Sequence, residues 1–235
     1  MKTIISKIRS DLQENTELKY KQGAERYFKE PVIYYGVRTA TVIKIGKRYW
    51  KEIKTWPKEK IFEISEELLK SDYSEEAYIV SQWGRNFNKF TIVDDLKVFE
   101  KWIEKYLNNW AKIDSFCTHT MGDFFTKFPT ETKVLLKWTK SKNRWVRRAS
   151  AVSLIVPASK GKFLDLIFDI CDILLLDKDD LVQKGYGWLL KVSTNHHQKE
   201  VFNYVMMKKD RMPRTALRYA IEKMPQDLKK KAMDK

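Results

Sequence analysis

The chain has 235 residues, enough to bury a sizeable hydrophobic core, and it carries 46 Lys and Arg against 31 Asp and Glu. The resulting net charge of +15 and pI of about 9.6 favour a polyanionic partner, above all nucleic acid, because each neutralised phosphate releases counterions. The alternative is that the charge serves solubility alone, but a domain of this size stays soluble with a much smaller net charge.

Membrane and secreted classes are not favoured. The most hydrophobic run, residues 164–176, contains three aspartates, and the first ten residues lack the apolar segment of an export signal. Cys117 and Cys171 lie far apart among apolar neighbours, so we expect buried free thiols and a reducing, cytoplasmic setting near the nucleoid.

Apolar residues recur every three to four positions along most of the chain, a spacing that predicts amphipathic helices. In the first half, helices are expected at residues 4–12, 17–28, 39–51, 57–69, 74–87 and 94–107. In the second half, they are expected at residues 110–128, 132–139, 145–155, 162–176, 181–192, 200–207 and 213–223. Thr39 is the expected N-cap of the third helix, after a loop that contains Pro31 and Gly36.

No segment shows the alternating pattern of a strand, so the sequence predicts an all-α protein. The helices are short and come in pairs, with one pair in about every forty residues, which is the period of HEAT-like arrays. We therefore expect an α-α superhelix of HEAT-like helical repeats with a concave basic groove. No flexible linker interrupts residues 1–235, which favours a single domain, and a groove that must admit a nucleic acid favours a monomer.

Two side chains of different chemistry share one helix face between Asn109 and Ser115. Trp110 and Asp114 are four positions apart, so a ring and a carboxylate lie about one turn from each other. A tryptophan taken singly is more often a core residue, but a ring beside an acid suits stacking on a base or sugar. Asp114 is either a capping or ion-paired carboxylate, or a catalytic group that stabilises developing positive charge.

Cations gather on helix faces in two later stretches. The first group is Arg144, Arg147 and Arg148, and the second is Lys184 and Lys191 with Trp188 between them. Guanidinium groups spaced over one and a half turns form a candidate phosphate-binding cluster, although Arg148 by itself is equally compatible with an ordinary surface cation.

The sequence lacks the motifs of sites that bind a metal or a nucleotide cofactor. His119, His196 and His197 do not have metal-ligand spacing with a carboxylate or thiol, and no glycine-rich phosphate loop is present. The sequence therefore predicts no metal and no cofactor.

Three motifs together resemble the AlkD-type alkylpurine DNA glycosylases. They are Trp110-x-x-x-Asp114, then Trp145-Val146-Arg147-Arg148-Ala149, then Gln183-Lys184-Gly185-Tyr186-Gly187-Trp188. Further segments match in the same order, namely Ala24-Glu25-Arg26-Tyr27, Tyr35-Gly36-Val37-Arg38-Thr39, Met121-Gly122-Asp123-Phe124-Phe125 and Pro213-Arg214-Thr215-Ala216-Leu217. The resemblance thus extends over most of the chain.

The resemblance implies an enzyme that binds duplex DNA in its concave groove and excises cationic N3- and N7-alkylated purines without a metal. By position, the active-site residues are Trp110, Asp114, Arg148 and Trp188, with Tyr27 a further aromatic residue beside the lesion. The remaining residues expected to contact DNA are Thr39, Arg144, Arg147, Lys184 and Lys191.

One departure stands next to the active-site tryptophan, where Asn109 replaces a second tryptophan often found in the family. Members that lack the aspartate bind DNA without excision, so the presence of Asp114 favours an active enzyme.

The chemistry is consistent with this set: an N3- or N7-alkylated purine is already cationic and leaves as a neutral base. The site then has to stabilise an oxocarbenium-like sugar. The alternative is a non-catalytic HEAT-like scaffold that binds DNA or RNA by shape.

Overall fold

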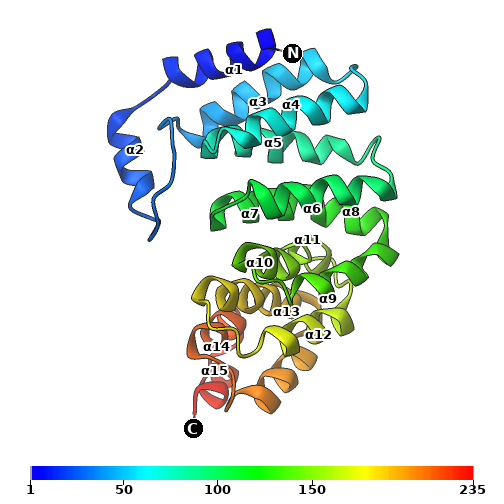
Figure 1. Ribbon diagram of the computed structural model, residues 1–235. Helices are drawn as coiled ribbons and strands as arrows, with labels where there is room; N and C mark the ends of the chain where they lie inside the picture. Colours follow the sequence, from blue (N-terminus) through cyan, green and yellow to red (C-terminus); the bar gives the residue numbers. More distant parts are fainter. Residues whose placement is uncertain (1, 235) are drawn as a thin grey trace. The chain divides into compact units, whose positions relative to one another are not determined.

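The computed structural model describes residues 2–234, and helices follow one another along this whole stretch (Figure 1). No strand forms among the described residues, where the one extended pairing is an isolated bridge between Ile33 and Tyr73. The prediction of an all-α protein is therefore confirmed.

The chain forms two compact units, Met1–Thr120 and Met121–Lys235, called here the N-terminal and C-terminal units. The N-terminal unit contains α1 (Lys2–Glu14), α2 (Leu18–Glu25), α3 (Thr39–Ile53), α4 (Lys58–Lys70), α5 (Ser74–Phe87), α6 (Leu96–Lys105) and α7 (Trp110–Phe116). The C-terminal unit contains α8 (Gly122–Lys127), α9 (Val134–Trp138), α10 (Arg144–Val152), α11 (Ile155–Ala158), α12 (Leu164–Leu174), α13 (Asp180–Lys208), α14 (Arg214–Ile221) and α15 (Gln226–Met233).

Aromatic side chains dominate the core of the N-terminal unit. Trp102 of α6 is fully buried, and its ring centroid lies 5.5 Å from that of Phe62 and 6.0 Å from that of Phe116, with the rings steeply inclined. Ile113 and Phe116 anchor α7 in this core. Trp110 and Asp114 consequently occupy the other side of α7, where both are half-buried.

A buried carboxylate fixes the loop before α3. Glu75, in the first turn of α5, accepts hydrogen bonds from the backbone N–H groups of Tyr35, Gly36 and Val37 at 3.1, 2.8 and 3.1 Å. Ser74 adds a backbone bond to Ile33 at 2.9 Å. The loop is therefore held to the N-terminus of α5, where the helix dipole also favours a negative charge.

In the C-terminal unit, α13 is the central element and packs against α10, α11, α12 and α14. The sequence predicts two helices here, at 181–192 and 200–207, and this prediction is confirmed, because α13 consists of two helical stretches that meet at a kink where His197 has a non-helical φ of −132° and ψ of 46°. At the kink, Nε2 of His196 and of His197 lie 3.0 Å from the carbonyl oxygens of Ser159 and Gly161.

Several local predictions need correction. The single helix expected at 110–128 is divided by a π-helical stretch, Cys117–Met121, between α7 and α8. Thr39 is not the N-cap of α3, because the helix begins at Thr39 itself and Arg38 occupies the cap position. A helix after Pro225, α15, was not predicted. Both cysteines are buried and free, as expected.

Candidate functional site

A pocket of about 800 Å³ opens in the N-terminal unit, within the size range of ligand sites. It lies between α2, the loop before α3, α5 and the start of α7. The lining residues are Glu17, Lys19, Tyr20, Gly23, Ala24, Arg26, Tyr27, Phe28, Tyr34, Arg38, Tyr78, Trp110 and Ala111. Two residues singled out from the sequence, Tyr27 and Trp110, thus line the same pocket.

Stacked rings form one wall of this pocket. The Trp110 ring stacks on Phe28, with centroids 5.2 Å apart and planes 21° from parallel, and Phe28 lies 5.9 Å from Tyr34. The hydroxyl groups of Tyr34 and Tyr78 are hydrogen-bonded to each other at 2.5 Å. Burial raises the pKa of both phenols above the ordinary value, so they stay neutral at physiological pH. The wall therefore offers flat apolar faces with neutral hydroxyl groups beside them.

The rim of the pocket is charged. Arg38 donates two hydrogen bonds to the carboxylate of Glu17, at 2.7 and 2.8 Å, and its guanidinium lies 5.6 Å from the ring centroid of Tyr20. The bond from Arg38 lowers the pKa of Glu17. Lys19 and Arg26 make no ion pair with any residue of the described stretch 2–234. The net charge of the rim is thus positive.

Helix α2 is lightly attached to the rest of the N-terminal unit. None of its residues is buried. One of its connections to the loop before α3 is at Gly36, whose carbonyl accepts a 3.0 Å bond from the N–H of Glu17. Gly36 has a φ of 98°, and a Cβ there would lie 2.7 Å from Cβ of Lys21. Only glycine permits both this backbone conformation and the close approach of α2.

The Trp110–Asp114 pair sits at the start of α7, as its spacing predicts. The side chain of Asn109 accepts a 2.9 Å bond from the N–H of Lys112 and so caps the helix. The residue that departs from the family pattern therefore has a structural role. One turn later, the carbonyl of Asp114 accepts a 2.7 Å bond from the Thr118 hydroxyl as the helix changes to π geometry. Such π stretches are rare and often occur at functional sites.

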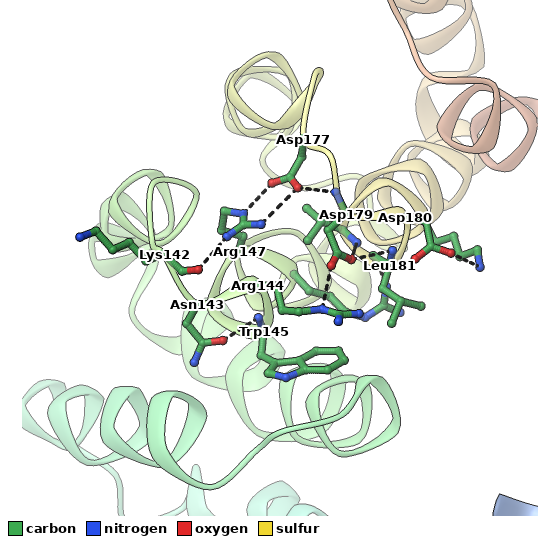
Figure 2. A network of polar contacts seen from close by, with 12 residues as sticks. Lys142, Asn143, Arg144, Trp145, Arg147, Asp177, Asp179, Asp180 and Leu181 are labelled. Carbon is green, nitrogen blue, oxygen red and sulfur yellow. Dashed lines mark hydrogen bonds and ion pairs between the residues drawn. The ribbon is translucent and has the colours of Figure 1, made fainter. Parts of the chain in front are cut away.

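In the C-terminal unit, two of the three arginines of α10 form ion pairs with carboxylates (Figure 2). Arg147 donates to both oxygens of Asp177, at 2.6 and 3.2 Å, and to the carbonyls of Ser141 and Lys142. Arg144 forms an ion pair with Asp179 at 2.7 Å. The expected cluster therefore does not present three unpaired cations.

Asp179 has a second role as the N-cap of α13, where it accepts bonds from the N–H groups of Leu181 and Val182 at 2.9 and 3.2 Å. Neither Asp177 nor Asp179 was predicted from the sequence as a partner of these arginines. The signal was available, because aspartates just before a helical stretch are frequent caps. What the pattern could not show is that the arginines of α10 pack next to this cap.

Arg148 is only 5% exposed, and its Nη1 donates a hydrogen bond to the carbonyl of Leu181. A Cβ at Gly185 would lie 3.4 Å from two atoms of the Arg148 side chain, and a Cβ at Gly187 only 2.7 Å from Cβ of Tyr219. The two glycines thus let α13 pack between α10 and α14. Trp188, immediately after them, is half-buried.

The two lysines expected to contact DNA also have carboxylate partners. Lys184 lies 3.2 Å from Asp180, and Lys191 lies 3.0 Å from Glu222. Both pairs are partly exposed to solvent, so they contribute little to stability and can exchange their carboxylate for another anion. Thr39, which was also expected to contact DNA, has its hydroxyl 3.3 Å from the hydroxyl of Tyr20 in the N-terminal unit.

Among residues 2–234, no group of three or more His, Cys, Asp or Glu side chains is arranged to hold a metal ion. In the same stretch, none of the helices is both long and apolar enough to cross a bilayer.

Comparison with known proteins gives a consistent result. The family model described as DNA alkylation repair enzyme matches residues 8–224. A solved structure described as a predicted DNA alkylation repair enzyme from Enterococcus faecalis superposes with a TM-score of 0.80 and 18% sequence identity, over 90% of this chain and 98% of that one. At this identity the likeness shows a shared all-α helical-repeat fold. No curated protein sequence matches the chain significantly.

Proposed function

Because the chain belongs to the family of DNA alkylation repair enzymes, we propose that it is a DNA glycosylase for cationic N3- and N7-alkylated purines. Family membership makes it an enzyme in the repair of alkylated DNA. The proposal adds the reaction, which is hydrolysis of the N-glycosidic bond in duplex DNA to release 3-methyladenine or 7-methylguanine. This release begins base excision repair, and we propose that the protein performs it as a monomer in the cytoplasm, without a cofactor.

The observation that carries the proposal is the arrangement on α7. The ring of Trp110 forms part of the pocket wall, and Asp114 follows one turn later on the same side of the helix, away from the core residues Ile113 and Phe116. An aromatic face attracts a cation, and a carboxylate stabilises positive charge that develops in a transition state. This pair suits a cationic purine and the sugar cation that its departure leaves.

The bond changes are simple. The C1′–N bond breaks, its electron pair neutralises the charged base, and a water oxygen then bonds to C1′ while its proton is lost. Asp114 is proposed to stabilise the oxocarbenium-like sugar and to accept that proton, as carboxylates do in glycoside hydrolysis. A base that already carries a positive charge needs no strong acid to leave. In the family pattern, Trp188 and Arg148 belong to the same catalytic set.

The test is release of free bases from duplex DNA treated with a methylating agent. Chromatography of the supernatant should show 3-methyladenine and 7-methylguanine with the protein and neither base above the spontaneous background without it. Binding to the same duplex is measured in parallel. Binding without release of either base would replace the proposal with the alternative of a non-catalytic scaffold.

A further inference from the structure

Lys112 is a charged side chain that the proposed mechanism does not use, although it lies two residues after Trp110. The side chain is only 1% exposed, and its ammonium group does not line the pocket. Three oxygens surround it: the backbone carbonyl of Asp72 at 2.8 Å, Oδ1 of Asp72 at 2.5 Å and Oδ1 of Asn108 at 3.0 Å. An ammonium group has three N–H donors, so its hydrogen-bonding capacity is fully used.

A gain in folding stability does not explain why the ammonium group of Lys112 is buried beside Asp72. Taking an ammonium group out of water is costly, and the attraction of a carboxylate often no more than repays that cost. An apolar side chain of similar volume would fill the same space without the penalty. Buried ion pairs are best attested as devices that select one register of packing over others.

The contacts of Asp72 show which packing arrangement of α7 the ion pair selects. Asp72 lies in the connection between α4 and α5 and has a φ of 64°, in the left-handed region. It also accepts a 2.8 Å bond from the side-chain amide of Asn108. Residues on both sides of Trp110, Asn108 before it and Lys112 after it, are therefore tied to this single aspartate.

We propose that Lys112 is a positioning residue that fixes the first turn of α7 against Asp72 and thereby sets the orientation of Trp110 in the pocket wall. Rotation or slippage of this turn would move the ring away from Phe28 and carry Asp114 with it. The proposal rests on the proposed function only for its measurement of base release.

The direct readout is the ¹⁹F NMR spectrum of protein labelled with 5-fluorotryptophan. The chain has eight tryptophans, and a Trp110→Phe variant assigns the resonance of Trp110. Lys112→Met, which keeps the length of the side chain and deletes its charge, should shift and broaden this resonance. The signals of Trp83 and Trp102, in the core, should stay in place. The rate of base release should fall on the order of 10–100-fold, the effect of a misplaced active-site group.

Two further variants separate positioning from folding. Lys58→Met is the matched control, because it breaks a similar lysine pair with Asp95, at 2.9 Å, in the same unit. It should leave the Trp110 resonance unchanged. Lys112→Met combined with Asp72→Asn removes the stranded carboxylate, so it should recover stability while the Trp110 resonance stays displaced.

An unmoved Trp110 resonance in folded Lys112→Met would overturn the proposal. So would return of the native resonance in the double variant, which would reduce Lys112 to a counterion for Asp72. A full rate of base release from a protein with a displaced Trp110 would also count against it. If the unaltered protein releases no base, the proposed function fails, and the resonance of Trp110 still decides whether Lys112 positions the ring.

Discussion

Asp177 receives two hydrogen bonds from the guanidinium group of Arg147, at 2.6 and 3.2 Å, and this pair joins the loop before α13 to α10. Both side chains are largely buried, with 20% of Arg147 and 8% of Asp177 exposed. A residue that the sequence marks as a phosphate ligand is thus part of the framework of the C-terminal unit.

Arg147→Ala should therefore lower stability by about 2–3 kcal/mol, because it strands the carboxylate of Asp177 and frees two backbone carbonyls. Lys184→Ala is the matched change, since its pair with Asp180 is more exposed, and it should cost about 0–1 kcal/mol. Urea denaturation measures both. Equal losses in the two variants would refute this division between structural and exchangeable cations.

These residues show which parts of the fold and of the candidate site can be predicted from the sequence. The helical period and the motif spacing predicted the all-α class and placed Trp110 and Asp114 on one side of α7, because both follow from local geometry. The aspartates opposite Arg144 and Arg147 were missed because they lie about thirty residues away along the chain. Local spacing carries no information on which distant side chains meet.

Thr39 shows a second limit of prediction from the sequence. Thr39 is a good cap by residue type, but Arg38 holds the cap position, and cap preferences are worth only about 1 kcal/mol. The polar stretch around His197 is a contrasting case, because the break predicted there is present as a kink with non-helical backbone, at which both histidines contact the turn at Ser159 and Gly161. Weak local preferences are thus overridden at Thr39 but not at His197.

Trp110→Ala and Trp188→Ala should fold with little loss of stability and slow base release, because both rings are half-buried. Trp102→Ala is the comparison, since this ring is fully buried and its removal should cost about 3–5 kcal/mol. Thermal melts of the three variants measure the difference. A loss at Trp110 or Trp188 as large as that at Trp102 would make the ring a core residue.

Gly36→Ala should loosen α2 and disturb the pocket wall. The left-handed φ of 98° costs an alanine about 1–2 kcal/mol, and the new Cβ would meet Lys21. Gly23→Ala is the matched control: it lies within α2 with no atom near its added Cβ, and it should stabilise the helix by up to about 1 kcal/mol. Hydrogen exchange of the α2 amides reports both effects, and unchanged protection in Gly36→Ala would contradict this account.

Lys112 should give a characteristic alkaline response. Burial lowers its pKa, against the opposing effect of Asp72, below the value of about 10.4 expected in the unfolded chain. Between these two values the unfolded state binds one more proton than the folded state, so the free energy of unfolding rises with pH. Relative to Lys112→Met, the unaltered protein should therefore gain stability as pH increases through this window. Urea melts of the two proteins from pH 7 to 10.5 measure the difference, and a constant difference would contradict a lowered pKa.

The sharpest prediction concerns Asp114→Asn, which keeps the size of the side chain and removes its charge. If Asp114 stabilises the sugar cation, duplex affinity should stay the same or rise slightly, since a negative charge leaves a basic protein. Base release should fall by about 10²–10³, the usual effect of losing one well-placed electrostatic group from a transition state. Single-turnover release of 7-methylguanine at saturating enzyme separates this step from binding. Asp94→Asn, at a carboxylate that is 77% exposed in the same unit, should keep the full rate. A rate for Asp114→Asn within a few-fold of the unaltered protein would remove the carboxylate from the mechanism, and with it the strongest argument that this chain hydrolyses a glycosidic bond.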